Sequence, residues 1–99
     1  MTLKQFKALN KRAGLHWFDK ETLRFFSSTV MDWDSVSGVF LTRERTGFDR
    51  EAPLAYTIRL ADFKTGRVST LSKFNEFNNY ETAVQAFYAE LSRRRRGDL

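Results

Sequence analysis

The alternation of side chains between residues 54 and 61 constrains the fold of this chain more than any other feature. Every second residue of this segment is large and apolar: Leu54, Tyr56, Ile58 and Leu60. A period of two is typical of a β-strand with one buried face. A turn sequence follows at 62–66, and a second extended segment over 67–74 completes a β-hairpin. A hairpin alone is only marginally stable, so other elements must cover its apolar face.

Two more strands and two helices are expected around this hairpin. Residues 27–31 and 39–45 have the composition of strands, and a Ser- and Asp-rich turn separates them. Apolar residues at helical spacing predict a helix over 2–13, with Thr2 as its N-cap, and a second one after residue 79. Asn78 and Glu81 are spaced as a capping box for that last helix. A short helical turn is expected over 20–24, after Asp19.

This order of elements predicts an α+β fold. We expect an antiparallel sheet of three to four strands, with the N-terminal and C-terminal helices packed on one face. The 99 residues leave room for one domain. We place that domain at residues 1–92 and a basic C-terminal tail at residues 93–99.

Several chemistries are excluded or disfavoured by the composition. The chain has no cysteine and one histidine, which argues against a cysteine nucleophile and most metal sites, and it carries no phosphate-binding glycine loop. His16 is the one candidate general base, and we interpret it as a partly buried structural residue. Asp32 and Asp34 are interpreted as solvated turn residues. We therefore expect no enzymatic activity, cofactor or metal. Without a long apolar run or a secretory signal, we expect a cytoplasmic protein with no membrane partner.

The positive charge is concentrated at the two ends of the chain. Residues 2–12 carry a charge of +4 and residues 93–99 carry +3, so the rest has −2 of the total of +5. The cations concerned are Lys4, Lys7, Lys11, Arg12, Arg93, Arg94, Arg95 and Arg96. Clusters of this kind neutralise phosphates in nucleic-acid-binding proteins. They are also found on ordinary solvated helix faces, so both interpretations stand.

The fifteen aromatic residues mostly suit a small core built of large side chains. Trp33 and Phe48 are exceptions, because each is flanked by polar residues in a predicted turn or loop. Exposed loop aromatics are frequent contact residues, and we include both among the candidate partner-binding residues.

Several short motifs occur in an order that resembles a known family. They are His16-Trp17-Phe18, Leu23–Ser28, Phe40-Leu41-Thr42-Arg43-Glu44, Tyr56-Thr57-Ile58-Arg59 and Gly66–Thr70 with Phe74. The chain resembles a family of small uncharacterised proteins carried by phages, plasmids and bacterial genomes. The resemblance spans residues 10–85 and implies no activity and no functional residue.

These observations support two functional hypotheses. The first is a non-enzymatic protein from a phage or mobile element that inhibits a host machine, in the manner of an anti-CRISPR protein, by contacting a host protein or ribonucleoprotein. The alternative is direct binding of DNA or RNA through the basic N-terminal helix and the arginine tail.

Overall fold

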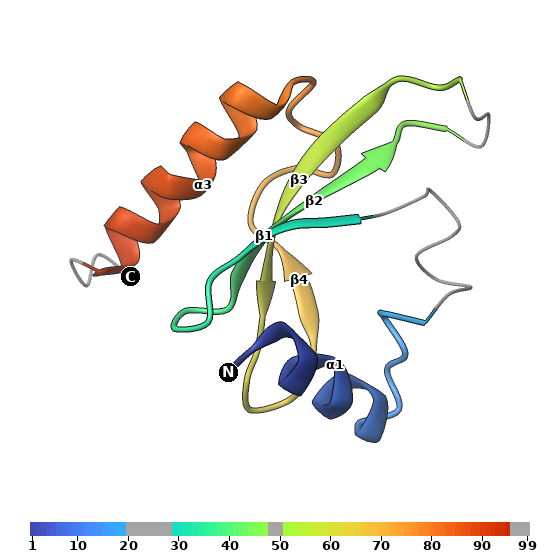
Figure 1. The fold of residues 1–99 in the computed structure, drawn as a ribbon, viewed down its shortest axis with the longest axis vertical. Helices are drawn as coiled ribbons and strands as arrows, with labels where there is room; N and C mark the ends of the chain where they lie inside the picture. Colours follow the sequence, from blue (N-terminus) through green and yellow to red (C-terminus); the bar gives the residue numbers. More distant parts are fainter. Residues whose placement is uncertain (20–28, 48–50, 96–99) are drawn as a thin grey trace.

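The computed structural model describes residues 1–19, 29–47 and 51–95 (Figure 1). The elements are helix α1 (Leu3–Arg12), strands β1 (Thr29–Trp33), β2 (Val39–Arg45), β3 (Leu54–Ala61) and β4 (Val68–Thr70), and helix α3 (Tyr80–Arg95). The strands form one sheet in the order β1-β2-β3-β4, and each neighbouring pair is antiparallel. The expected α+β fold, with a helix at each end of an antiparallel sheet, is confirmed.

The centre of the sheet is the long pairing of β2 with β3. This pairing runs without interruption from Val39 opposite Leu60 to Arg45 opposite Leu54. The β1–β2 pairing is less regular, because a bulge at Met31 places one extra residue in β1. Such a bulge twists an edge strand and discourages pairing with another chain.

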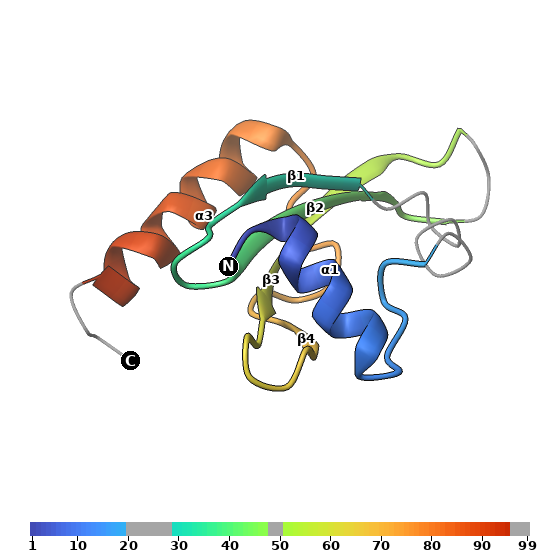
Figure 2. The same cartoon turned by 60° about the horizontal axis from the view of Figure 1, so that its bottom comes forward.

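The two helices lie on opposite faces of the sheet, so the prediction that both pack on one face was wrong (Figure 2). Successive residues of β2 point to opposite faces, as in any strand. Val39 and Leu41 pack with Phe87 of α3, whereas Phe40 packs with Phe6 of α1. The apolar residues of β2 therefore serve two separate cores, each closed by a different helix.

Helix α1 begins and ends close to the predicted residues. The Thr2 hydroxyl accepts the N–H of Gln5 at 3.1 Å, and the Gln5 side chain accepts the N–H of Thr2 at 2.9 Å. This reciprocal capping box satisfies two amides that a helix N-terminus would otherwise leave unpaired. Gly14 follows the helix with φ of 75°, in the left-handed region that glycine adopts at low cost.

Other predicted boundaries were wrong by a few residues. Asn79, rather than Asn78, caps α3, because its side chain accepts the N–H of Thr82 at 2.9 Å. Strand β4 ends at residue 70, since the Ser72 hydroxyl accepts the N–H of Ile58 in place of a backbone carbonyl. Helix α3 continues to residue 95, so the basic segment begins inside the helix. The helical turn predicted at 20–24 lies outside the described residues.

Candidate nucleic-acid interface

Helix α1 presents a face of exposed cations. Lys4, Lys7, Lys11 and Arg12 are all exposed, while Phe6 is fully buried against the sheet. The ammonium group of Lys7 lies 5.8 Å from the centroid of the Phe18 ring, a cation–π contact at the edge of the helix. The first acidic residue of the chain is at position 19. All the charged side chains of α1 are therefore cations, as the sequence predicted.

The turn between β3 and β4 adds two cations next to this helix. The Asn10 amide donates to the Gly66 carbonyl at 2.8 Å, and the Phe6 and Phe63 rings lie 6.0 Å apart. These contacts fix the turn against α1, with Lys64 and Arg67 exposed on it. Nothing in the sequence pattern placed this turn beside the helix.

The C-terminal end of α3 approaches the same turn. Arg94 lines a surface hollow of about 370 Å³ together with Lys64 and Phe63 of the turn, Ser37 and residues 60–62. Glu90 accepts hydrogen bonds from Arg93 and, at 3.0 Å, from Arg94. The bond from Arg93, followed by the one from Arg94, holds the pKa of Glu90 below its ordinary value. Glu90 thus offsets part of the charge of these arginines.

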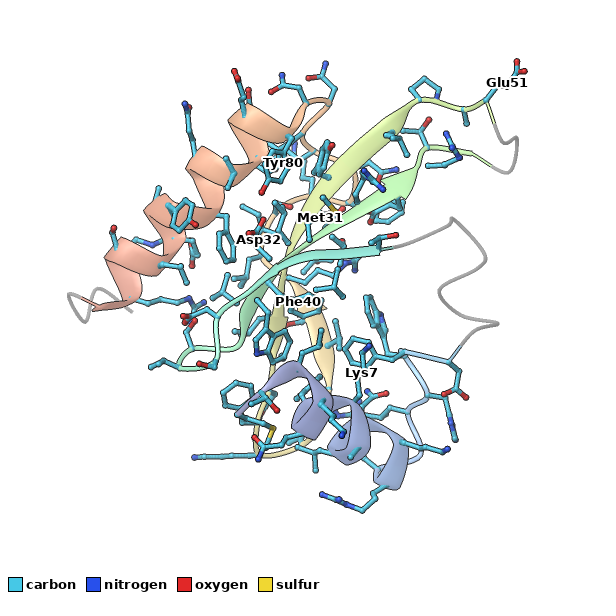
Figure 3. The ribbon with its side chains drawn as sticks, in the orientation of Figure 1. Lys7, Met31, Asp32, Phe40, Glu51 and Tyr80 are labelled. Carbon is cyan, nitrogen blue, oxygen red and sulfur yellow. The ribbon has the colours of Figure 1, made fainter. Side chains whose placement is uncertain are left out.

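The β3–β4 turn therefore has cations on both sides of it, those of α1 on one side and those at the end of α3 on the other, and we call these three segments together the basic end. Its described members are Lys4, Lys7, Lys11, Arg12, Lys64, Arg67, Arg93 and Arg94. Figure 3 shows Lys7 on α1, in the lower half of the view, and Glu51 at the upper end of the molecule. The two charged chain segments, 80 residues apart in sequence, each lie beside the β3–β4 turn.

Three acids lie at or beside the basic end, and each has a local partner. Asp34 accepts from the backbone and the hydroxyl of Ser37 at 2.8 and 2.5 Å. Asp62 accepts from the backbone amides of Lys64 and Thr65 at 2.8 and 3.2 Å, and these bonds lower its pKa. The third acid is Glu90, described above. Only Glu90 is paired with cations, whereas Asp34 and Asp62 bind neutral donors and keep their negative charge, so the eight cations of the basic end outnumber these acids by five.

The other predicted contact residues do not join this surface. Trp33 belongs to β1 rather than to a turn, and its ring packs on Phe6, Phe40 and Phe63 at 5.3–6.2 Å between centroids. Its half-buried indole donates to the Met1 carbonyl at 3.1 Å. Phe48 and Arg96 lie outside the described residues.

A buried polar cluster on the α1 side of the sheet is the main feature that sequence reasoning missed. Glu44 is fully buried and accepts from Arg59 at 2.8 Å and from Thr57 at 3.0 Å. Arg59 also donates to Thr42 at 2.9 Å, and its guanidinium lies 5.1 Å from the centroid of the Trp17 ring. These are the polar positions of the motifs at 40–44 and 56–59. Their spacing of two residues was the signal that they share a face.

The candidate acid–base residues show no catalytic arrangement within the described part of the chain. His16 is more exposed than predicted, with half of its side chain accessible and Nδ1 3.0 Å from Asp19 Oδ2. It lies in the connector after α1, with a φ of 55°, and belongs to neither hydrophobic core. Asp32 accepts the hydroxyl of Tyr80 at 2.9 Å, which raises the pKa of that tyrosine (Figure 3).

Two other kinds of feature are absent from the described residues. No group of three or more His, Cys, Asp or Glu side chains there could hold a metal ion. No helix in the same residues is long and apolar enough to cross a membrane.

Comparison with protein families gives one match, to a family of unknown function, DUF7447, over residues 2–88. The chain belongs to this family. The DUF7447 match covers α1, the four strands and about half of α3, and it ends before the arginine-rich segment. No curated protein and no solved structure matches the chain.

Proposed function

We propose that this protein binds nucleic acid through phosphate contacts made by the basic end. The observation that carries the proposal is that α1 and the end of α3 both lie beside the β3–β4 turn, which adds Lys64 and Arg67 to their cations. Eight described cations belong to these segments, against the three acids Asp34, Asp62 and Glu90. Clustered cations of this kind bind phosphates with displacement of condensed counterions, so the affinity depends steeply on salt.

The test is fluorescence anisotropy of a labelled oligonucleotide at increasing salt. If about four cations contact phosphates, the affinity for a duplex should fall about 100-fold between 50 and 200 mM salt. A flat salt response, or no binding at 50 mM salt, would refute the proposal.

A matched pair of substitutions locates the surface. Lys11→Gln removes a cation of the basic end and should lower the slope of log K against log salt by about 0.9. Lys73→Gln removes an exposed lysine from the connector between β4 and α3 and should leave the slope unchanged. Equal effects of the two substitutions would show that binding follows total charge rather than this surface.

A third variant uses the one acid that is paired with arginines. Glu90→Gln removes the negative charge between Arg93 and Arg94. The affinity for nucleic acid should rise, because a carboxylate no longer competes with phosphates for the two guanidinium groups. An unchanged affinity would exclude the end of α3 from the interface.

Contact with an acidic protein surface is the second candidate, and one observation favours it. Val36, at the tip of the β1–β2 turn, is 86% exposed, and neighbouring Ser37 lines the hollow beside Lys64 and Arg94. An apolar residue beside cations can anchor a complementary acidic partner. This version corresponds to inhibition of a host machine in a bacterial cytoplasm by a protein of phage or mobile-element origin.

A pull-down from bacterial lysate separates the two candidates. Partners that are lost after nuclease treatment support nucleic-acid binding. A single protein that survives nuclease and is lost with Val36→Asp supports the protein contact.

A further inference from the structure

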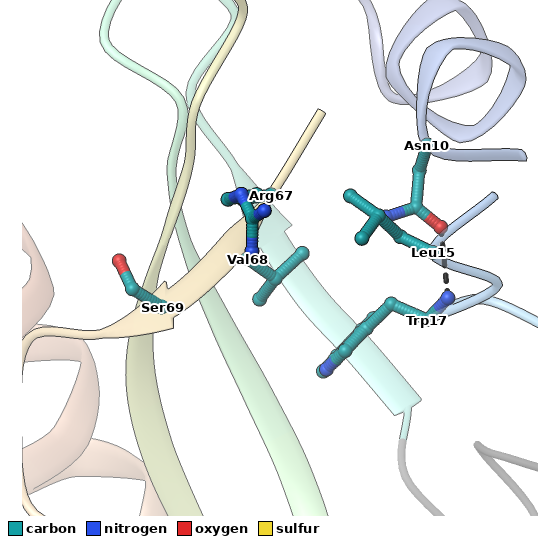
Figure 4. A pocket seen from close by; sticks show the side chains of 6 residues that line it. All are labelled: Asn10, Leu15, Trp17, Arg67, Val68 and Ser69. Atoms are coloured by element: carbon teal, nitrogen blue, oxygen red, sulfur yellow. Dashed lines mark hydrogen bonds between the residues drawn. The ribbon is translucent and has the colours of Figure 1, made fainter. Parts of the chain in front are cut away.

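A pocket of about 250 Å³ opens between the connector after α1 and strand β4 (Figure 4). Its lining residues are Asn10, Leu15, Trp17, Arg67, Val68 and Ser69. The pocket is smaller than the roughly 300–1,000 Å³ of sites for drug-sized ligands, and it suits a single ring system. Arg67, a member of the basic end, forms part of its wall.

The pocket is held open by one buried side chain. Asn10 is 1% exposed, and its amide donates to the Gly66 carbonyl at 2.8 Å. Its oxygen accepts the N–H of Trp17 at 2.8 Å, the bond drawn as a dashed line in Figure 4. Asn10 therefore joins α1, the β3–β4 turn and the connector. A pocket built in this way needs little reorganisation when a ligand enters.

The Trp17 wall of the pocket is rigid as well. Its ring packs edge-on with Phe18 and Phe40, at 4.8 and 5.8 Å between centroids. The guanidinium of Arg59 lies over the same ring, 5.1 Å from its centroid. The indole is thus fixed in place before any ligand arrives.

The lining combines two kinds of chemistry. Leu15, Val68 and the Trp17 indole supply apolar surface, which suits a planar aromatic ring. Arg67 supplies a cation at the same pocket, and Lys11 and Arg12 occupy the last turn of α1 just before Leu15. A planar ring joined to a phosphate matches this arrangement, and that combination is a nucleotide.

We propose that this pocket receives one unpaired base of a single-stranded nucleic acid whose phosphates lie on the basic end. The inference rests on the proposed function and adds a preference for single strands. In a duplex every base is paired and stacked within the helix, so none is available to the pocket. Contact of one base with an aromatic wall is worth a factor of about 5 to 100 in affinity.

The experiment compares three labelled oligonucleotides of equal length at one salt concentration: a single strand, its duplex, and the same strand with abasic sites throughout. The single strand should bind about 5- to 100-fold more tightly than the abasic strand, which carries the same phosphates. It should also bind more tightly than the duplex. Equal affinity for the three would overturn the base pocket while leaving phosphate binding intact. Absence of binding by all three at low salt would refute both proposals.

Two leucines of equal exposure provide a matched pair of variants. Leu15 lines the pocket and is 38% exposed, and Leu71, directly after β4 and outside the pocket lining, is 37% exposed. Leu15→Ser should reduce the affinity for the single strand toward that for the abasic strand, and Leu71→Ser should not. Thermal melting of both variants checks that they fold. An unchanged single-strand preference in Leu15→Ser would overturn the proposal.

Adenosine monophosphate, added alone, tests the free-nucleotide alternative. Absence of binding at millimolar concentration, together with tight binding of the single strand, supports the strand proposal. Saturable binding of the mononucleotide without any preference for single strands would assign the pocket to a free nucleotide and overturn the strand proposal.

Discussion

Removing one partner of the buried Glu44–Arg59 pair should strongly destabilise the fold. Glu44 is fully buried and the Arg59 side chain is 10% exposed, so water cannot solvate a charge that has lost its partner. Breaking a buried ion pair costs about 3–5 kcal/mol. Domains of this size have a free energy of unfolding of about 5–15 kcal/mol, so Glu44→Leu or Arg59→Met alone should remove a large part of it.

Replacing both residues together should cost far less than either single change. In Glu44→Leu/Arg59→Met, no charge remains to be desolvated, and apolar side chains occupy the site beside the rings of Trp17 and Phe74. Exchanges of this kind are often neutral or stabilising. The double variant should therefore be more stable than either single variant by about 2 kcal/mol or more.

Urea denaturation of the wild type and the three variants measures this cycle. The slope of the free energy of unfolding against urea concentration should be the same for all four proteins if the substitutions do not change the compactness of the native and unfolded states. If the single variants do not fold, a folded double variant still supports the argument. Additive losses in the double variant, or a loss below about 1 kcal/mol for Glu44→Leu, would refute it.

Three further predictions concern the turns and helix ends. Gly38→Ala should lower the free energy of unfolding by about 2–5 kcal/mol, because φ is +83° and the added Cβ would lie 2.3 Å from the Ala61 carbonyl oxygen. Gly14→Ala has no atom within 4 Å of the added Cβ and should lower it by only about 1–2 kcal/mol. Thermal melts of the two variants measure the difference. Asn79→Ala should cost about 1 kcal/mol through loss of the α3 cap, and Asn78→Ala should stay within about 0.5 kcal/mol, as urea titration would show. The pKa of Glu90 is lower in the folded protein than its ordinary value of 4.5, so its ionised form stabilises the fold at pH above 4.5. This stabilisation is lost as the pH falls through the pKa of the folded protein. Glu90→Gln should therefore abolish this part of the decline in melting temperature at acidic pH.

Local sequence patterns were sufficient to predict the elements of the fold. The alternation at 54–61 and the capping of α1 by Thr2 both depend on residues that are close in sequence. Such patterns do not say which face of the sheet a helix covers. One apolar stripe on α1 could pack on either side, and the choice is made by long-range contacts such as that of Phe6 with Phe40.

The candidate surface was predictable only in part. The cations of α1 are visible in the sequence, but the position of Lys64 and Arg67 between this helix and Arg94 results from the path of the β3–β4 turn. The buried pair is not predictable from the strand pattern, because Glu and Arg are rarely buried and such residues in a strand ordinarily indicate an exposed position. The burial of Asn10 is not predictable from its position in the helix, because it depends on hydrogen bonds to Gly66 and Trp17 outside the helix.

The buried ion pair also has a consequence for strand alignment during folding. Both faces of β2 and β3 carry apolar residues, so hydrophobic burial alone distinguishes poorly between the native alignment and one shifted by a single residue. Such a shift moves every side chain of the slipped strand to the other face. It would place Glu44 or Arg59 beneath α3, among Phe87 and Leu91, without a partner. We therefore expect the ion pair to disfavour strand pairings that are shifted by one residue. The apolar double variant should populate such shifted pairings more often, even where its stability is unchanged.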